Sequence, residues 1–265
     1  MKEQNYLIVD LGLPSGLKWA DRNVGAETPQ DNGLYFSWGN VDGHTVDENG
    51  VELVKNTNYY YINLKGERLN IDAQMTKENV IDGYSFDRDT YPNTLGGQYT
   101  GSTLDAEHDA ATVNMGSDWR MPTSAETLEL VQNTDHYYIG ESGNIVAGPF
   151  DYGTNSWDKG LVDWDKELLD VFNFKLRSIC FVKKGEDFNY NDRSNFIEFP
   201  FAGACSGPFL RRYDLAGYIL SSSVDDSDVK YVRFLDFDKF GHLNCKGISR
   251  HFGFSVRGVT SNNKI

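Results

Sequence analysis

The chain has 265 residues, enough to bury a substantial core in one large domain or two small ones. Its formal net charge is −14. A surface of that charge repels both a phosphate backbone and an anionic membrane, so we expect neither nucleic-acid binding nor membrane insertion. The aromatic share of 14% and the 26 glycines favour short β-strands and many turns over long amphipathic helices.

The N-terminal segment, residues 1–10, lacks the basic start, the apolar stretch and the small-residue cleavage site of a signal peptide. No apolar run approaches the roughly 20 residues that a membrane-spanning helix needs. We therefore expect a protein that either stays in the cell that makes it or leaves by a route without a signal. Lysis that releases assembled virus particles is one such route.

The three cysteines, Cys180, Cys205 and Cys245, are far apart and form no CxxC pair, which excludes a zinc ribbon or a redox motif. We interpret them as small buried side chains that stay reduced. A single disulfide between Cys205 and Cys245 is the alternative.

The first third of the chain predicts strands and turns. Residues 6–20 predict a β-hairpin, because two apolar runs flank the turn residues Pro14 to Gly16. Thr28 and Pro29 predict a short helical turn, since a capping residue precedes a first-turn proline. Residues 34–38 then return to a strand pattern.

The clearest helix signal lies in the middle of the chain. Thr123 and Glu126 form a capping box, in which each side chain accepts a hydrogen bond from a backbone N–H group at the helix start. The helix is expected to end near Thr134, and a second helical stretch is expected over Asp163–Asp170. Apolar residues supply the buried face of the first helix: Leu128, Leu130 and Val131.

The C-terminal part returns to strand patterns separated by Gly, Asp and Ser. The expected strands are Ser178–Lys183, Phe196–Phe201, Gly217–Ser222, Lys230–Asp236 and Phe252–Val256. No internal repeat or linker divides the chain, so we expect a single domain over residues 1–265, with loop-rich insertions at about 40–103 and 140–175. The fold class is α+β with antiparallel strands.

Several sequence blocks together resemble the Fibrobacter succinogenes major paralogous domain family. They lie at both ends and in the middle of the chain: VDLGLPSGLKWA at 9–20, NVGA at 23–26, YFSWG at 35–39, DAAT at 109–112, WRMPT at 119–123 with Glu126, FPFAG at 199–203, SSS at 221–223 and GFSVR at 253–257.

The resemblance implies a C-type-lectin-like fold, in which the N- and C-terminal strands pair and two helices flank irregular sheets. That fold is shared by variable ligand-binding proteins, phage receptor-binding proteins and sulfatase-modifying-factor enzymes. Family members are common in gut Bacteroidota and in their phages. Large aromatics among glycine-rich turns are expected to anchor the core, with two arginines as buried or half-buried polar ties. The expected structural core is Trp19, Trp38, Trp119, Arg120 and Arg257.

Catalytic and metal-binding motifs are absent from the sequence. It contains no GxSxG, no HExxH and no phosphate-binding glycine pattern, and its histidines lack metal-ligand spacing. The sugar-binding calcium motifs of C-type lectins are absent as well. The acidic residues Asp225 to Asp228 and Asp236 to Asp238 fit solvated hairpin turns better than a calcium loop. We therefore expect no enzyme activity, no metal and no cofactor.

Recognition of a partner is the remaining interpretation. Tyr and Asn are frequent in the candidate loops at 59–61, 137–138 and 188–191, and such residues suit glycan or protein contacts. The alternative is that they only fill solvated loops. Because the resembling fold places variable ligand contacts near its late strands, the candidate ligand-binding residues are Arg211, Arg212, Tyr213, Asp225, His242 and Arg250.

Three functions are compatible with these observations. The first is a phage virion surface protein, such as a fibre, tail or capsid-decoration component, that recognises a bacterial surface glycan or protein and associates with other virion proteins or copies of itself. The second is a bacterial cell-surface adhesin or glycan-binding module. The third is an assembly protein with a purely structural role.

Overall fold

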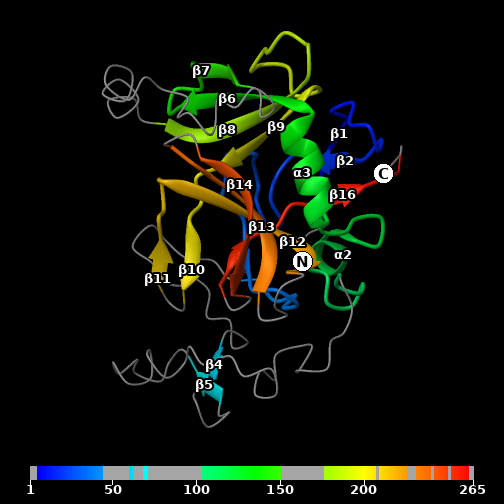
Figure 1. Cartoon of the computed structure of the whole chain (residues 1–265), viewed down its shortest axis with the longest axis vertical. Helices are drawn as coiled ribbons and strands as arrows, with labels where there is room; N and C mark the ends of the chain where they lie inside the picture. The colour runs from blue at the N-terminus through cyan, green and yellow to red at the C-terminus, as the bar shows by residue number, and fades with distance from the viewer. Residues whose placement is uncertain are drawn as a thin grey trace.

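The computed structural model describes residues 5–43, 60–62, 68–70, 103–150, 176–206, 209–225, 231–239, 242–249 and 252–262. Within these ranges the protein consists mostly of antiparallel β-sheets with two α-helices (Figure 1). This agrees with the expected α+β class. The helix expected over 163–170 and most of the loop-rich insertions at 40–103 and 140–175 lie outside the described residues.

The two ends of the chain meet in a three-stranded antiparallel sheet. Strands β1 (Ile8–Val9) and β2 (Lys18–Ala20) form the hairpin expected over residues 6–20, and the amide of Gly16 closes the turn on the Leu13 carbonyl at 2.8 Å. Strand β16 (Val259–Thr260) pairs with β2 on its other side. Closure of the sheet by both termini ties the start of the chain to its end.

A five-stranded sheet forms the centre of the molecule, in the order β14-β13-β12-β15-β3. The long hairpins β12–β13 and β13–β14 are antiparallel, and β15 lies parallel to β12. The bounds of its strands are β3 Tyr35–Phe36, β12 Ala216–Val224, β13 Tyr231–Asp238, β14 Leu243–Ser249 and β15 Phe254–Ser255. Both of its faces carry apolar residues.

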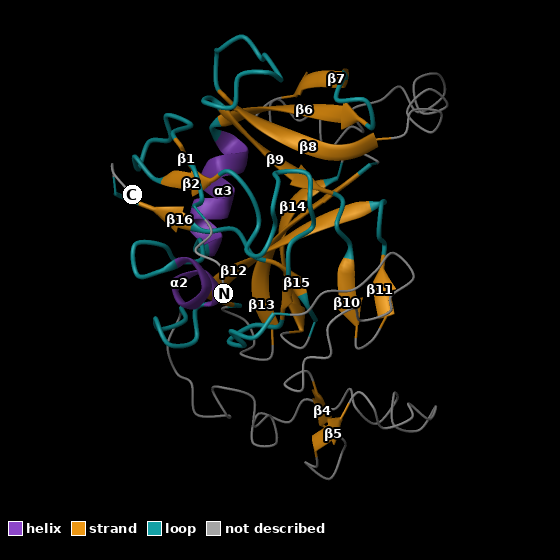
Figure 2. Ribbon diagram, turned by 180° about the vertical axis from the view of Figure 1, so that it is seen from behind, coloured by secondary structure: helices purple, strands orange, loops and turns teal. Residues whose placement is uncertain are grey.

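Alternation along the strands divides these apolar residues between two cores. In β13, Leu235 and Phe237 join one cluster together with Trp19 and Leu130, whereas Phe234 joins a second cluster on the other face. The helix α3 (Ser124–Gln132) covers the first face, where it contacts β12, β13 and β14 (Figure 2). The central sheet is therefore covered on both sides.

A four-stranded antiparallel sheet, in the order β7-β6-β8-β9, completes the first core. Strands β8 and β9 correspond to predicted strands, whereas β6 and β7 were not predicted. The bounds are β6 Thr134–Gly140, β7 Ile145–Phe150, β8 Leu176–Lys183 and β9 Phe196–Pro200. Two short hairpins complete the described strands: β4 Tyr60–Ile62 with β5 Arg68–Asn70, and β10 Ala204–Ser206 with β11 Phe209–Arg211.

The predicted capping box is confirmed at the start of α3. The Thr123 hydroxyl accepts from the Glu126 amide at 3.3 Å, and the Glu126 carboxylate accepts from the Thr123 amide at 2.8 Å. The predicted buried face is wrong in one position, because Thr127 is buried with Leu130 and Val131 while Leu128 stays partly exposed. The Thr127 hydroxyl donates a hydrogen bond to the Ser124 carbonyl at 2.8 Å. Because this bond satisfies the hydroxyl within the helix, a polar residue can face the core.

Two further expectations need correction. Thr28 and Pro29 form part of a turn closed by hydrogen bonds between Thr28 and Asp31, and no helix follows. The second described helix is α2 (Ala110–Met115), which was not predicted from the sequence. Asp109 caps it, because its side chain accepts from the Thr112 amide.

Most of the expected structural core is buried. Trp19, Trp38, Trp119 and Arg257 are each at most 3% exposed. Arg120 is the half-buried polar tie that was expected, but it is not part of the core: its side chain is 45% exposed, and its guanidinium pairs with Glu126. The side chain is long enough to reach the carboxylate that caps α3 without entering the core.

The guanidinium of Arg257 is the polar tie that the sequence predicted. It donates to the Asn23 side chain at 2.9 Å, to the Ala20 carbonyl at 3.0 Å and to the Glu198 carbonyl at 2.7 Å. It also lies over the ring of Phe199. Burial lowers the pKa of Arg257 to about 9, which leaves the group charged at neutral pH. One side chain thus connects the N-terminal hairpin, β9 and the chain's last strands.

Candidate functional site

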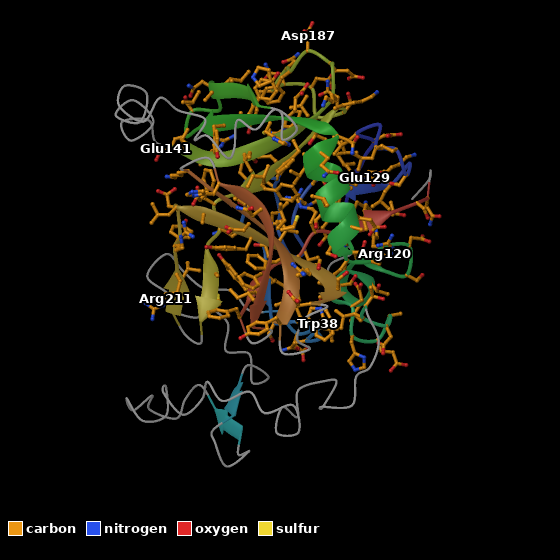
Figure 3. All side chains as sticks on the ribbon, viewed as in Figure 1. Trp38, Arg120, Glu129, Glu141, Asp187 and Arg211 are labelled. Atoms are coloured by element: carbon orange, nitrogen blue, oxygen red, sulfur yellow. The ribbon has the colours of Figure 1, made fainter. Side chains whose placement is uncertain are left out.

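The six candidate ligand-binding residues do not form one site. Arg211 ends β11 and lies at the outer edge of the molecule in Figure 3. Arg212 and Tyr213 follow it in the turn before β12. His242 lies in the turn between β13 and β14, and Arg250 lies outside the described residues.

Asp225 is separated from the others. It follows β12 at the far end of that strand, is buried, and forms an ion pair with Arg233 at 3.1 Å. A carboxylate engaged in this way stabilises the β12–β13 connection. The structure therefore does not place Asp225 in a ligand surface with Arg212 and His242.

A residue outside the predicted set brings Arg212 and His242 together. The Asp238 carboxylate is almost fully buried, and its Oδ2 lies 3.0 Å from Nη2 of Arg212 and 2.9 Å from Nδ1 of His242. The Arg212 Nη1 donates to the Tyr218 hydroxyl at 3.1 Å. Burial raises the pKa of the Tyr218 hydroxyl, and the charge of Arg212 offsets that rise only in part. The hydroxyl therefore stays neutral and accepts this bond.

The backbone beside this carboxylate adopts an unusual conformation. Arg212 and Asp214 have positive φ angles of 52° and 57°, which are uncommon for residues other than glycine. The amides of Leu215 and Ala216 both donate to the Arg212 carbonyl at 3.0 Å, and these bonds hold the turn. Strained backbone of this kind is retained where the surroundings determine it, often at functional sites.

The two turns are also joined to each other. The Lys239 ammonium pairs with the Asp214 carboxylate at 3.0 Å, and the Lys239 amide donates to the Leu215 carbonyl at 3.0 Å. Tyr213 and Leu215 are 36% and 45% exposed on this joined structure. We call residues 211–215 together with Asp238, Lys239 and His242 the Asp238 surface.

The interpretation of the acidic residues as solvated turns is wrong for the part the structure describes. Asp236 and Asp238 belong to β13 and are buried, and Asp225 is buried as well. Residues 226–228 lie outside the described ranges. In the described part of the chain, no group of three or more His, Cys, Asp or Glu residues is placed to hold a metal ion.

The tyrosine-rich loops also differ from the expectation. Tyr138 is buried and donates to the Asp238 carbonyl at 2.7 Å, while Tyr137 stacks on Phe188. Tyr190 packs on Phe196 and donates to the carboxylate of Glu198 at 2.7 Å. Tyr138 belongs to the first core, and Tyr137 and Tyr190 pack, partly buried, against a smaller one. The side chains of residues 59–61 lie outside the described part.

The three cysteines form no disulfide, as expected, so none joins Cys205 to Cys245. Cys180 and Cys205 are buried and Cys245 is partly exposed. Burial raises the pKa of Cys180 and of Cys245, so both stay in the unreactive thiol form.

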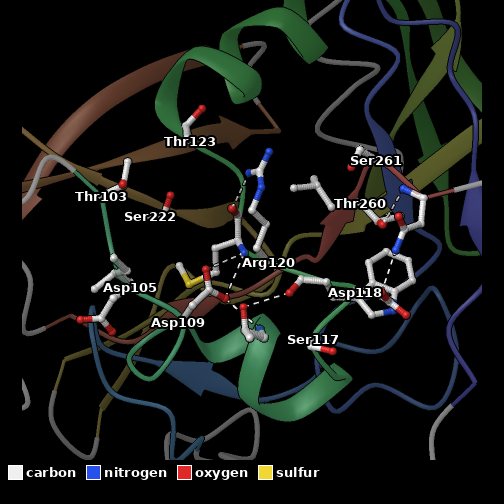
Figure 4. Close-up of a pocket in the computed structure, with 17 residues that line it drawn as sticks. Thr103, Asp105, Asp109, Ser117, Asp118, Arg120, Thr123, Ser222, Thr260 and Ser261 are labelled. Atoms are coloured by element: carbon white, nitrogen blue, oxygen red, sulfur yellow. Dashed lines mark hydrogen bonds between the residues drawn. The ribbon is translucent and has the colours of Figure 1, made fainter.

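A cavity of about 560 Å³ lies away from the Asp238 surface (Figure 4). It is bordered by α2, by the segment 117–121 that follows it, and by β16 with the residues after it. No local sequence signal indicates this cavity, because its walls come from segments near residues 103, 118, 222 and 260 that only the fold brings together.

Comparison with known proteins gives no relative: no family model, no curated protein and no solved structure matches the chain. Among the described helices, neither is long and apolar enough to cross a membrane.

Proposed function

We propose that the protein is a non-catalytic binding module with a C-type-lectin-like fold, and that the Asp238 surface contacts its receptor. The observation that carries this proposal is the joining of two turns, from different strand pairs, through one buried carboxylate. Arg212 and His242 are held on Asp238, which fixes their direction at the surface. Pre-organised side chains lose less entropy on binding.

The exposed residues of this surface have the composition of a recognition site. Tyr213 and Arg212 belong to the residue types that dominate binding energy at interfaces, and Leu215 adds apolar area beside them. His242, whose side chain is 57% exposed, supplies a hydrogen-bonding group at the rim. Such a set suits a bacterial surface glycan or a protein receptor better than a hydrophobic ligand.

For the biological setting, we propose the surface of a phage virion, where the chain is a fibre, tail or capsid-decoration component. The resemblance to the Fibrobacter succinogenes major paralogous domain family and the strongly acidic composition support this setting. Its partners are then other virion proteins or copies of itself, in addition to the receptor. Mass spectrometry of purified phage particles tests the location, and absence of the chain from every particle fraction would contradict it.

Binding of the labelled full chain to intact gut Bacteroidota cells and to a glycan array, with and without EDTA, tests the receptor function. We expect saturable binding that survives EDTA. The substitution Tyr213→Ala should weaken it at least about tenfold, the loss expected for a central aromatic anchor.

Tyr231→Ala is the matched control, because Tyr231 is 43% exposed at the opposite end of β13 and should leave binding unchanged. Equal losses in both variants would refute the location of the site. Absence of binding to any cell or glycan would refute the receptor function and favour a structural role in assembly.

A further inference from the structure

The cavity beside α2 is separate from the Asp238 surface and has walls of a distinct chemistry. Its volume of about 560 Å³ lies within the range of small-molecule sites, which is roughly 300–1,000 Å³. Hydroxyl groups of Thr103, Ser117 and Thr123 and the carboxylates of Asp105 and Asp118 line it. Leu104 and Ala106 add apolar surface.

The charges around the cavity disfavour an anionic ligand. Arg120 is the single basic residue among the lining residues that the structure describes, and it is already engaged. Its Nη1 and Nη2 donate to the Glu126 carboxylate at 2.7 and 2.6 Å, and Nη1 also donates to the Met121 carbonyl at 3.1 Å. A ligand phosphate or carboxylate would therefore meet the negative charges of Asp105 and Asp118 without a free guanidinium to offset them.

A cationic ligand is also poorly matched. Asp105 and Asp118 lie on opposite sides of the cavity in Figure 4 and are exposed to solvent, so they do not jointly surround one positive charge. The third lining carboxylate, Asp109, is buried and accepts from the amides of Thr112 and Met121. The indole of Trp119 is also buried, which leaves no open aromatic face for an ammonium group.

The remaining hydrogen-bonding capacity suits hydroxyl groups. Asp105 uses Oδ1 on His108, and Asp118 uses Oδ1 on the Asn262 side chain at 2.7 Å. Within the described ranges, the Oδ2 atoms of both carboxylates make no hydrogen bond and can accept from ligand hydroxyls. The Ser117 hydroxyl likewise has no partner in the described structure and can both donate and accept.

We infer that this cavity binds an uncharged, hydroxyl-rich ligand with the chemistry of a sugar. Asp105 and Asp118 accept hydrogen bonds from ligand hydroxyls on opposite sides, Ser117 and Thr123 offer further hydroxyl contacts, and the apolar lining faces the C–H groups of the ring. The inference does not depend on the Asp238 surface, so either proposal can fail without the other.

Titration of the full chain with neutral sugars tests this inference, with saturation-transfer NMR and calorimetry as readouts. The probes are glucose, galactose, mannose, N-acetylglucosamine and maltose, with glucuronate as the anionic and glucosamine as the cationic comparison. We expect saturable binding of at least one neutral sugar and weaker binding of both charged sugars. Tighter binding of a charged sugar, or binding of none, would overturn the inference.

A double substitution locates the binding. Asp105→Asn with Asp118→Asn keeps the side-chain shape but removes the charge-assisted hydrogen bonds, and it should weaken sugar binding about tenfold. Asp187→Asn is the matched control, since Asp187 is an exposed carboxylate on the loop after β8 (Figure 3). Unchanged affinity in the double variant would refute this cavity as the binding site.

A second measurement covers the case in which the double variant does not fold. In the wild-type chain, titration should shift the backbone amide NMR signals of residues 117–118 and 260–262, which border the cavity. Shifts confined to residues 211–215 would place the sugar on the Asp238 surface and overturn the inference. Binding to cells should remain dependent on Tyr213 and independent of Asp105 and Asp118, which separates this test from that of the receptor function.

Discussion

Replacing Glu198 by glutamine tests the polar centre of the four-stranded sheet. The side chain of Glu198 is fully buried in β9, and its two oxygens accept hydrogen bonds of 2.6 to 3.2 Å. The donors come from three separate stretches of the chain: Gln30 Nε2, Arg177 Nε, Ser178 Oγ, the Tyr190 hydroxyl and Arg193 Nη1. A single carboxylate therefore joins the turn near residue 30, β8, β9 and the loop before β9.

The expected cost follows from charge and geometry. Glu198→Gln removes the negative charge and turns one of the two acceptor oxygens into an NH₂ donor, so at least two donors lose their acceptor and face another donor. Breaking a buried ion pair by removing one partner costs about 3–5 kcal/mol. Arg177 and Arg193 keep 26% and 34% of their side chains exposed, and water can partly replace the lost partner. We therefore expect a loss of about 3 kcal/mol in the free energy of unfolding.

Urea unfolding followed by circular dichroism measures this loss as a lower midpoint at unchanged slope. The control is Glu186→Gln, because Glu186 forms an exposed pair with Lys183 and its loss should change stability little. A change below about 1 kcal/mol for Glu198→Gln, the size of an ordinary substitution, would refute the reasoning.

The same substitution predicts a pH dependence. Burial alone would raise the pKa of the Glu198 carboxyl, but the hydrogen bonds from Ser178, Tyr190 and Arg193 outweigh burial and lower it below its usual 4.5. A lowered folded-state pKa gives stability that is fully present above the unfolded-state value and is lost as pH falls through the folded-state value. The stability difference between wild type and Glu198→Gln should thus stay constant above about pH 5 and shrink below about pH 4.5. A constant difference down to acid unfolding would contradict this.

Three more substitutions test other parts of the fold, each by urea unfolding. Thr123→Ala removes one half of the capping box of α3 and should cost about 1 kcal/mol, whereas no loss would mean that tertiary contacts alone hold the helix start. Gly203→Ala should lower the free energy of unfolding by about 1–3 kcal/mol, because Gly203 has φ 69° and an added Cβ would lie 2.5 Å from the Arg211 carbonyl oxygen. An unchanged free energy of unfolding would show that the β10–β11 hairpin shifts to make room for the Cβ. Arg257→Met leaves two buried carbonyls and an amide oxygen without their donor and should cost about 3 kcal/mol or more. A stable methionine variant would show that this guanidinium is replaceable by apolar packing.

The elements that the sequence predicted are those whose signals are local. The capping box of Thr123 and Glu126 spans three residues, and the N-terminal hairpin is set by its own turn. Strands β8, β9, β12, β13 and β15 were predicted because apolar runs between Gly and Asp are contiguous in the chain, whereas β14 and β16 were not predicted. Strand β6 was missed because Thr134 follows α3 after a single residue, and its alternating polar residues gave no turn signal to separate it from the helix.

The sequence-based predictions failed mainly for buried polar residues, because the burial of a polar side chain depends on partners that are distant in the chain. Asp238 lies in a stretch with the composition of a hairpin turn, but its partner Arg212 is 26 positions earlier. Tyr190 lies in an Asn-rich loop, yet it packs on Phe196 and bonds to Glu198. A buried carboxylate is tolerated only with such partners, and one sequence does not reveal which arginine will reach it.

The two candidate sites differ in how much of each was open to prediction, and the difference has a physical cause. At the Asp238 surface, Arg212, Tyr213 and His242 were candidates because the resembling fold places variable ligand contacts near its late strands. The residue that organises them was missed, because a buried carboxylate is recognised only through its partners. The cavity was missed entirely, since Asp105 and Asp118 look like ordinary solvated residues until the fold sets them across a shared space. A variant that disturbs Asp238 should therefore release both turns at once, whereas variants at Asp105 or Asp118 should change ligand binding and leave the fold intact.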